Sequence, residues 1–367
     1  MSGLRITYSL ADQSFAKTKS IGIFNLSLGL AREFQSRSEV EKLHILTNST
    51  LQHLVRPADN TTTSNHDRGI QGQLGRMIWD QWKLYSTAKG TGTDWLFLPK
   101  GFASFIRKPP MRLATCVADT IHDYYRDRHP TAVSGLEDRY FDHSLRATIK
   151  YSDVIFTISE FTRSEVVRVA TKLGMKPPPV IHAGIGFEEP AQPVSPGKSG
   201  IMVLAGRYPH KRTKEAIALL DRWQRDSAFT EAVNWIGSLP KGAIMPDRSN
   251  WKLHSRLSEE DYRQLVARSR VLLFTSEYEG YGMPPVEATL VGTVPVFSAI
   301  PATIEVMGQT GLPFDNENPG SFTKAMNAAL QANPDDVSRW KTDLLARHSW
   351  RIVGDRILAG LRQAMTS

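Results

Sequence analysis

Two glutamates in the C-terminal half stand beside a turn from a strand into a helix, a place where parallel sheets bind ligands. The apolar run at 271–274 predicts a buried strand, and the polar loop after it contains Glu279. Pro284 and Pro285 predict the start of a helix, with Glu287 in its first turn. Acidic residues are favoured in any first helical turn, so the glutamates indicate a binding site only together with the whole strand, loop and helix.

The loop between this strand and this helix suits a phosphorylated sugar. Its glycines, Gly280 and Gly282, allow a ligand close to the backbone, and free amides at a helix start favour a diphosphate. Carboxylates would repel the phosphates, so we expect them to reach past the phosphates to hydroxyl groups. Because a carboxylate can accept hydrogen bonds from two neighbouring hydroxyls, Glu279 and Glu287 are predicted to hold a sugar ring and a ribose.

A second group of candidate residues follows the apolar run at 201–205, which predicts another strand. Arg207 and Lys211 come next, just before a helical pattern, and would offset the charge of a leaving diphosphate. The alternative is a solvated basic helix start. Since a helix start is unfavourable for unpaired cations, we favour anion binding.

The segment from Glu279 to Ala288, EGYGMPPVEA, resembles the E-x7-E signature of family-4 retaining glycosyltransferases, usually E-G-F-G-L-P-x-x-E-A. These enzymes have the GT-B fold. By that resemblance Glu279 contacts the donor sugar and Glu287 the donor ribose. The residues Arg207 and Lys211 match a G-R…K arrangement that binds the donor phosphates. The backbone amides that the resemblance assigns to the sugar or phosphates belong to Gly280, Tyr281, Gly282 and Met283.

The resemblance covers most of the chain but is less specific outside this segment. His122 follows a strand-like run and is expected to contact the transferred sugar, with Asp123 orienting its ring. Gly22 precedes the first predicted helix, where glycine lets amides approach a phosphate. Leu257 follows the run at 251–254, where the family reads the nucleotide base, mainly through its backbone.

Strand-like runs alternate with helical patterns through both halves, which predicts parallel α/β sheets. Proline, glycine and serine gather at 188–199 and predict a linker. We therefore expect the GT-B architecture, two Rossmann-like lobes that face a central cleft. Residues 1–187 would form the acceptor-binding lobe, joined by a C-terminal helix at 349–367, and residues 188–348 the donor-binding lobe.

The composition limits the classes of partner. The net charge is +8 and the chain has a single cysteine, and it has neither a secretory signal at its start nor an apolar run long enough to span a membrane. We expect a cytoplasmic protein that binds no nucleic acid, because no basic run or recognition module is present. Arg107 and Lys108, beside Phe105 and Ile106, suggest peripheral contact with anionic lipid at the inner membrane face, and the alternative is a solvated loop.

Together these features predict transfer of a hexose, mannose or a related sugar, from a nucleotide-diphosphate sugar to a hydroxyl of a glycan or lipid-linked glycan. The resemblance implies retention at the anomeric carbon. The chain looks most like mannosyltransferases of bacterial surface-polysaccharide assembly, which favours a GDP-sugar over a UDP-sugar as the donor. No cofactor or metal is expected, because positive side chains stand in for the D-x-D motif of metal-dependent enzymes. The alternatives are a sugar-nucleotide epimerase of the same fold and a non-catalytic sugar-nucleotide-binding scaffold.

Overall fold

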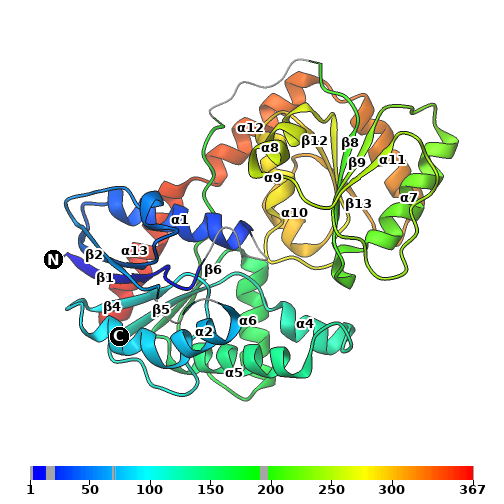
Figure 1. The fold of residues 1–367 in the computed structure, drawn as a ribbon. Coiled ribbons are helices and arrows are strands. Elements are labelled where there is room, and N and C mark those ends of the chain that lie inside the picture. The colour runs from blue at the N-terminus through cyan, green and yellow to red at the C-terminus, as the bar shows by residue number, and fades with distance from the viewer. Residues whose placement is uncertain (1–2, 14–20, 68–69, 71, 191–196, 367) are drawn as a thin grey trace. The chain divides into compact units, whose positions relative to one another are not determined.

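The computed structural model describes residues 3–13, 21–67, 70, 72–190 and 197–366. The chain divides into two compact units. Unit 1 comprises Met1–Phe187 and His348–Ser367, and unit 2 comprises Glu188–Arg347. Each unit is a parallel sheet with helices packed against it, so the predicted α/β class is confirmed (Figure 1).

The seven-stranded sheet of unit 1 has the order β3-β2-β1-β4-β5-β6-β7. Its strands are β1 (Leu4–Ser9), β2 (Val40–Thr47), β3 (Thr61–Asn65), β4 (Trp95–Leu98), β5 (Arg112–Val117), β6 (Val154–Thr157) and β7 (Val180–His182). The helices are α1 (Ile21–Ser36), α2 (Gly72–Ile78), α3 (Leu84–Lys89), α4 (Ile121–Arg128), α5 (Gly135–Tyr151), α6 (Glu160–Lys172) and α13 (Trp350–Thr366), with a 3-10 turn, η2, at Gln52–Leu54. A π-helical turn, η3 (Trp79–Lys83), joins α2 to α3 without a break.

Both faces of this sheet are buried, as expected for parallel strands with apolar side chains on either side. On one face, the rings of Tyr8 of β1, Phe97 of β4 and Phe156 of β6 stack in a row, with centroids 5.4 and 6.0 Å apart. Helix α13 returns to this unit and packs on α1, β6 and β7. Gly29 of α1 makes that packing possible, because a Cβ there would lie 1.9 Å from the Trp350 ring.

The six-stranded sheet of unit 2 has the order β10-β9-β8-β11-β12-β13. Its strands are β8 (Ile201–Ala205), β9 (Val233–Gly237), β10 (Trp251–His254), β11 (Val271–Phe274), β12 (Val294–Ser298) and β13 (Leu312–Phe314). The helices are α7 (Thr213–Asp226), α8 (Glu259–Arg268), α9 (Met283–Leu290), α10 (Pro301–Met307), α11 (Pro319–Leu330) and α12 (Pro334–Arg347), with a 3-10 turn, η4, at Pro209–Lys211.

Side chains of successive residues in these strands point to opposite faces, so each strand contributes to two cores. Ile201 and Val203 pack with Trp223 of α7 and Phe322 of α11 on one face. Met202 packs with residues of α8 and α9 on the other face. In Figure 1, α7 and α11 accordingly lie on one side of the sheet and α8 and α9 on the other. No helix within the described ranges has both the length and the apolar character needed to cross a membrane.

Candidate functional site

Two loops meet beyond the carboxyl ends of β8 and β11, which are neighbours in the sheet of unit 2. After β8 the chain builds β9 and β10 on one side, and after β11 it builds β12 and β13 on the other. Connections that leave a sheet in opposite directions open a crevice at the strand ends, and ligands of open α/β sheets bind there. Arg207 and Lys211 lie in the first loop and Glu279 in the second, so the fold brings these three predicted residues to that crevice.

The two loops are joined by backbone and side-chain contacts. The amide of Glu277 donates to the carbonyl of His210 at 2.8 Å, and the Thr275 hydroxyl donates to the carbonyl of Lys211 at 3.0 Å. Lys211 Nζ lies 2.5 Å from Glu279 Oε1. These contacts fix the ammonium and the carboxylate against each other at the head of helix α9.

The ion pair keeps the carboxyl group of Glu279 ionised. Burial alone would raise its pKa, but the Lys211 ammonium and then His210 outweigh burial and leave the pKa below its usual value. The Lys211 ammonium also lies 5.6 Å from the centroid of the Phe274 ring. The crevice therefore holds a negative and a positive group that neutralise each other when no ligand is bound.

Two cations of this basic loop are paired with carboxylates, so the argument from unpaired cations does not apply to them. Lys211 pairs with Glu279, and Arg212 lies 3.3 Å from Glu277 and 3.2 Å from Glu317. The reason is the strand order, because β8 and β11 are adjacent and their following loops, one basic and one acidic, run together. Arg207 is exposed and donates to the Tyr208 hydroxyl at 2.9 Å, so it remains accessible to an anionic ligand.

Helix α9 begins with an unusual backbone at Gly282, its N-cap residue, where φ is +92°. A side chain there would be strained and its Cβ would lie 2.7 Å from Thr303 Cγ2. Pro284 and Pro285 have no amide hydrogen, so only Gly282 and Met283 offer N–H groups at the very start of the helix. Binding of a ligand by the amides of residues 280–283, including those of Gly280 and Tyr281, stays a prediction.

Glu287 lies in the second turn of α9 rather than in the first, because the helix already begins at Met283. Burial raises the pKa of its carboxyl group to about 7, and the Arg263 guanidinium offsets this only in part. Tyr262 of α8 packs against the cluster that contains Ala288 of α9. Burial raises the pKa of this phenol, and the charge of Glu287 raises it further. Glu287 is thus a proton-binding group at neutral pH, unlike Glu279.

The remaining predicted residues lie elsewhere. Leu257 follows the edge strand β10, just before α8, and β9 separates that strand from β8. His122 lies in the first turn of α4 of unit 1, and its ring stacks on Phe141 at a centroid distance of 3.9 Å. Gly22 is the second residue of α1 rather than a residue before it. The roles of these three residues stay predictions.

Asp123, expected to orient the His122 ring, has a structural role. Its side chain is buried, and its oxygens lie 2.6 Å from Arg168 and 3.2 Å from Arg126. These cations outweigh the effect of burial and lower its pKa. The carboxylate therefore ties α4 to α6.

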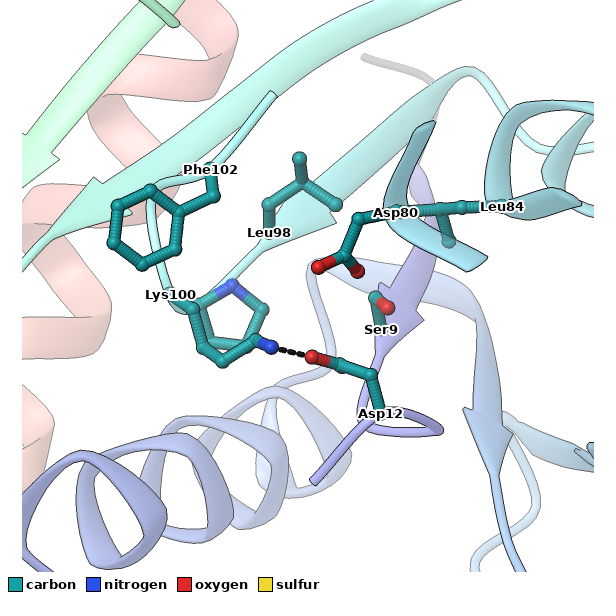
Figure 2. Close-up of a pocket in the computed structure, with 8 residues that line it drawn as sticks. Ser9, Asp12, Asp80, Leu84, Leu98, Lys100 and Phe102 are labelled. Carbon is teal, nitrogen blue, oxygen red and sulfur yellow. Dashed lines mark ion pairs between the residues drawn. The ribbon is translucent and has the colours of Figure 1, made fainter. Parts of the chain in front are cut away.

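A polar pocket in unit 1 contains residues that were not predicted (Figure 2). Asp12 follows β1, Lys100 follows β4, and their side chains form an ion pair. Asp80 of η3 points toward the same pocket, where burial raises its pKa to about 7, and it accepts from the Tyr140 hydroxyl at 3.3 Å. Burial likewise lowers the pKa of Lys100 to about 7. The cavity holds about 10 Å³, near the size of one water or one hydroxyl group.

This pocket lies at the switch point of the first sheet, since the strands after β1 extend one way and those from β4 the other. The sequence does contain a signal for it, because Asp12 and Lys100 each come shortly after a strand-like run. Among the described residues, no group of three or more His, Cys, Asp or Glu side chains is arranged to hold a metal ion.

A protein-family match covers part of unit 2, and a curated relative matches most of the chain. Residues 248–342, which include Glu279 and Glu287 but not Arg207 or Lys211, match the family described as Glycosyl transferases group 1. An O-antigen chain mannosyltransferase B from Escherichia coli is 23% identical over 358 residues, which cover 84% of this chain and 87% of that protein.

Solved structures match almost the whole chain at low identity. A sucrose-phosphate synthase from Thermosynechococcus elongatus superimposes with a TM-score of 0.68 at 13% identity, covering 99% of each chain. HepE of Anabaena, in complex with UDP and glucose, has a TM-score of 0.68 at 15% identity and covers 98% of this chain and 100% of its own. The chain thus has the predicted GT-B fold. The matched family region in unit 2 and the relative that covers most of the chain together indicate a glycosyltransferase.

Proposed function

We propose that the chain transfers a hexose from a nucleotide-diphosphate sugar to a hydroxyl group of a glycan or lipid-linked glycan, with retention at the anomeric carbon. The observation that carries this proposal is the Lys211–Glu279 pair, 2.5 Å apart, at the switch point of unit 2 and the head of α9. A cation for phosphate and a carboxylate for sugar hydroxyls stand side by side there. A nucleotide-diphosphate sugar carries both kinds of partner, a diphosphate for the cation and sugar hydroxyls for the carboxylate.

Donor binding would exchange the partners of this pair. The diphosphate takes the place of Glu279 beside Lys211, and the freed carboxylate accepts hydrogen bonds from hydroxyls of the sugar. Arg207, exposed at the edge of the same crevice, would contact the diphosphate. Glu287, in the second turn of α9, would accept hydrogen bonds from the ribose when its carboxyl group is ionised.

The reaction breaks the bond between the anomeric carbon and the phosphate oxygen and forms a bond from that carbon to the acceptor oxygen. The acceptor proton passes to the departing phosphate oxygen on the same face. Lys211 and Arg207, rather than a metal ion, would stabilise the charge that develops on the diphosphate. We place the acceptor on unit 1, where the pocket of Asp12 and Lys100 has room for one hydroxyl group.

We propose GDP-mannose or a related GDP-sugar as the donor, with UDP-sugars as the second choice. The likeness to the O-antigen mannosyltransferase over most of the chain supports a mannosyl donor. The named ligands of HepE, UDP and glucose, support a UDP-sugar. We also propose a cytoplasmic setting, where nucleotide sugars are at hand.

Calorimetric titration of the purified protein with GDP, UDP and ADP tests the donor assignment. One nucleotide should bind, and Lys211→Ala should weaken it by about ten- to a hundredfold, the size of a charge-assisted contact. Lys324→Ala serves as the control, because Lys324 is exposed on helix α11 and belongs to neither loop of the crevice. No binding, or equal loss in both variants, would contradict the assignment.

Activity is tested with the sugar nucleotide whose base binds and with glycan acceptors. Proton NMR of the product gives the anomeric configuration, and the α-linkage of an α-linked donor should be retained. An epimerised sugar nucleotide formed without acceptor would instead identify an epimerase. Binding with no turnover of any acceptor would favour a scaffold.

A further inference from the structure

Three large apolar side chains form an exposed row on the helical segment from Gly72 to Lys89. Leu74 is 70% exposed, Ile78 38% and Trp82 43%. They are four residues apart, so they lie on one face of the helix. The π-helical turn at Trp79–Lys83 keeps Ile78 and Trp82 in line, because its wider turn places the fourth residue on nearly the same face.

A loop adds two more exposed apolar residues to this row. Phe105 is 37% exposed and Ile106 45%. The amide of Phe105 donates to the Gln81 side chain at 3.0 Å, and the Ser104 hydroxyl donates to the Gln81 carbonyl at 2.9 Å. These bonds hold the loop against η3, next to the turn that carries Trp82. We name this surface, made of Leu74, Ile78, Trp82, Phe105 and Ile106, the apolar surface.

Basic residues surround the apolar surface. Lys83, Arg107 and Lys108 are exposed, and among the described residues none of the three forms an ion pair. The helical segment contains one acid, Asp80, whose carboxyl group points into the pocket of Figure 2 and accepts from Tyr140. The outer face of this part of unit 1 therefore combines large apolar side chains with unneutralised positive charge.

We propose that the apolar surface docks on an anionic lipid bilayer, with Leu74, Ile78 and Trp82 entering the headgroup region. A helix that lies in a membrane interface has this make-up, an apolar face that includes an aromatic residue and lysines or arginines at its edge. The charge distinguishes this partner from a second copy of the chain, since two copies would bring the basic rims together. Within the segment, η3 is held against α5, because Gln81 donates to the Tyr140 hydroxyl and that hydroxyl donates to Asp80.

Flotation of the full chain with vesicles tests this proposal, using phosphatidylcholine alone and phosphatidylcholine with phosphatidylglycerol. The chain should bind the anionic vesicles and lose most of that binding at high salt, which screens the charges. The triple variant Leu74→Ser, Ile78→Ser, Trp82→Ser should lose binding at any salt. Ile244→Ser with Leu253→Ser, both exposed apolar residues of unit 2, should bind like the unchanged chain.

The charge contribution is measured separately. Arg107→Ala with Lys108→Ala should lower the partition coefficient by roughly 25-fold, about fivefold for each cation near an anionic surface. Lys241→Ala with Lys324→Ala, exposed in unit 2, changes the net charge equally and should have little effect. Circular dichroism confirms that each variant is folded.

Three outcomes would overturn the proposal. The chain binds neutral and anionic vesicles equally or binds neither, the triple variant Leu74→Ser, Ile78→Ser, Trp82→Ser binds as well as the unchanged chain, or the unit 2 variants lose as much binding as the unit 1 variants. A concentration-dependent dimer that the triple serine variant abolishes, with no vesicle binding, would assign the surface to a second copy instead. No nucleotide sugar enters these assays, so their result is independent of the proposed transfer reaction.

Discussion

Replacing Glu279 with glutamine removes the negative charge that holds Lys211 when no donor is bound. Lys211 and Glu279 are 30% and 20% exposed, so their bond is partly shielded from water. A charge-assisted hydrogen bond in such a place contributes about 1–2 kcal/mol, more than an exposed pair and less than a fully buried one. A nucleoside diphosphate must give Lys211 a replacement for this bond. GDP should therefore bind Glu279→Gln roughly five- to thirtyfold more tightly than the unchanged chain.

The sugar nucleotide should respond differently to the same change. If Glu279 accepts hydrogen bonds from the donor sugar, the variant loses them, and the preference for GDP-mannose over GDP should fall. Transfer should fall by about a hundred- to a thousandfold in kcat/KM, the usual effect of removing one group that orients or stabilises the reacting centre.

Calorimetry with GDP and GDP-mannose gives both affinities. Glu277→Gln is the matched control, since Glu277 lies in the same loop but pairs with Arg212. It should change the GDP affinity by less than about twofold. Weaker GDP binding by Glu279→Gln, or the same tightening by Glu277→Gln, would refute the idea that Glu279 competes with the diphosphate for Lys211.

Three other changes give measurable effects. Burial raises the pKa of Glu287 from 4.5 to about 7. Between these pH values the folded chain holds a proton on Glu287 that the unfolded chain has released, so the folded state loses stability as pH rises. Glu287→Gln should therefore be more stable than the unchanged chain by about 2 kcal/mol at pH 8 and equal to it at pH 4, as measured by chemical denaturation at each pH. If the ionised carboxylate holds the ribose, GDP affinity should rise with pH through 7 in the unchanged chain and not in this variant. The pKa of Asp80 is raised from 3.8 to about 7, so its effect on stability has the same sign. Asp80→Asn should add about 2–4 kcal/mol of stability at pH 8, at least as much as Glu287→Gln, and none near pH 4; a variant equally stabilised at both pH values would contradict the shift. Gly282→Ala should destabilise the fold more than Gly242→Ala. Both glycines have positive φ, but only a Cβ added at Gly282 would meet a neighbour, Thr303 Cγ2 at 2.7 Å. The free energies of unfolding of the two variants should differ by about 1–2 kcal/mol, and equal values would show that the contact relaxes freely.

The local elements around the site could be predicted from the sequence. The run at 271–274 is β11, and the prolines at 284 and 285 lie in the first turn of α9. Such features depend on apolar runs, prolines and glycines that act within a few residues of one another. The exact register of the helix start could not be read, because the αL conformation of Gly282 lets the helix begin at Met283 and moves Glu287 into the second turn.

The pairing of side chains across the sheet was not predictable in the same way. That Lys211 faces Glu279 depends on β8 and β11 being neighbours, and a single sequence does not give the order of strands. The pocket of Asp12, Asp80 and Lys100 was missed for the same reason, since it joins three segments far apart in the chain. The exposed row of Leu74, Ile78 and Trp82 was missed because apolar spacing along a helix indicates a buried face unless the structure shows which face is covered.

The chain leaves unit 1 at Phe187 and returns to it only at His348, so unit 2 is an insertion within unit 1. Helix α13 supplies Trp350 to the groove at Gly29 and packs against β6 and β7, so unit 1 lacks part of its core until the last residues are made. During synthesis on the ribosome, unit 2 has all of its own strands before unit 1 is complete. Unit 1 is therefore completed only after unit 2, and a truncation that removes α13 should destabilise unit 1 while leaving unit 2 intact.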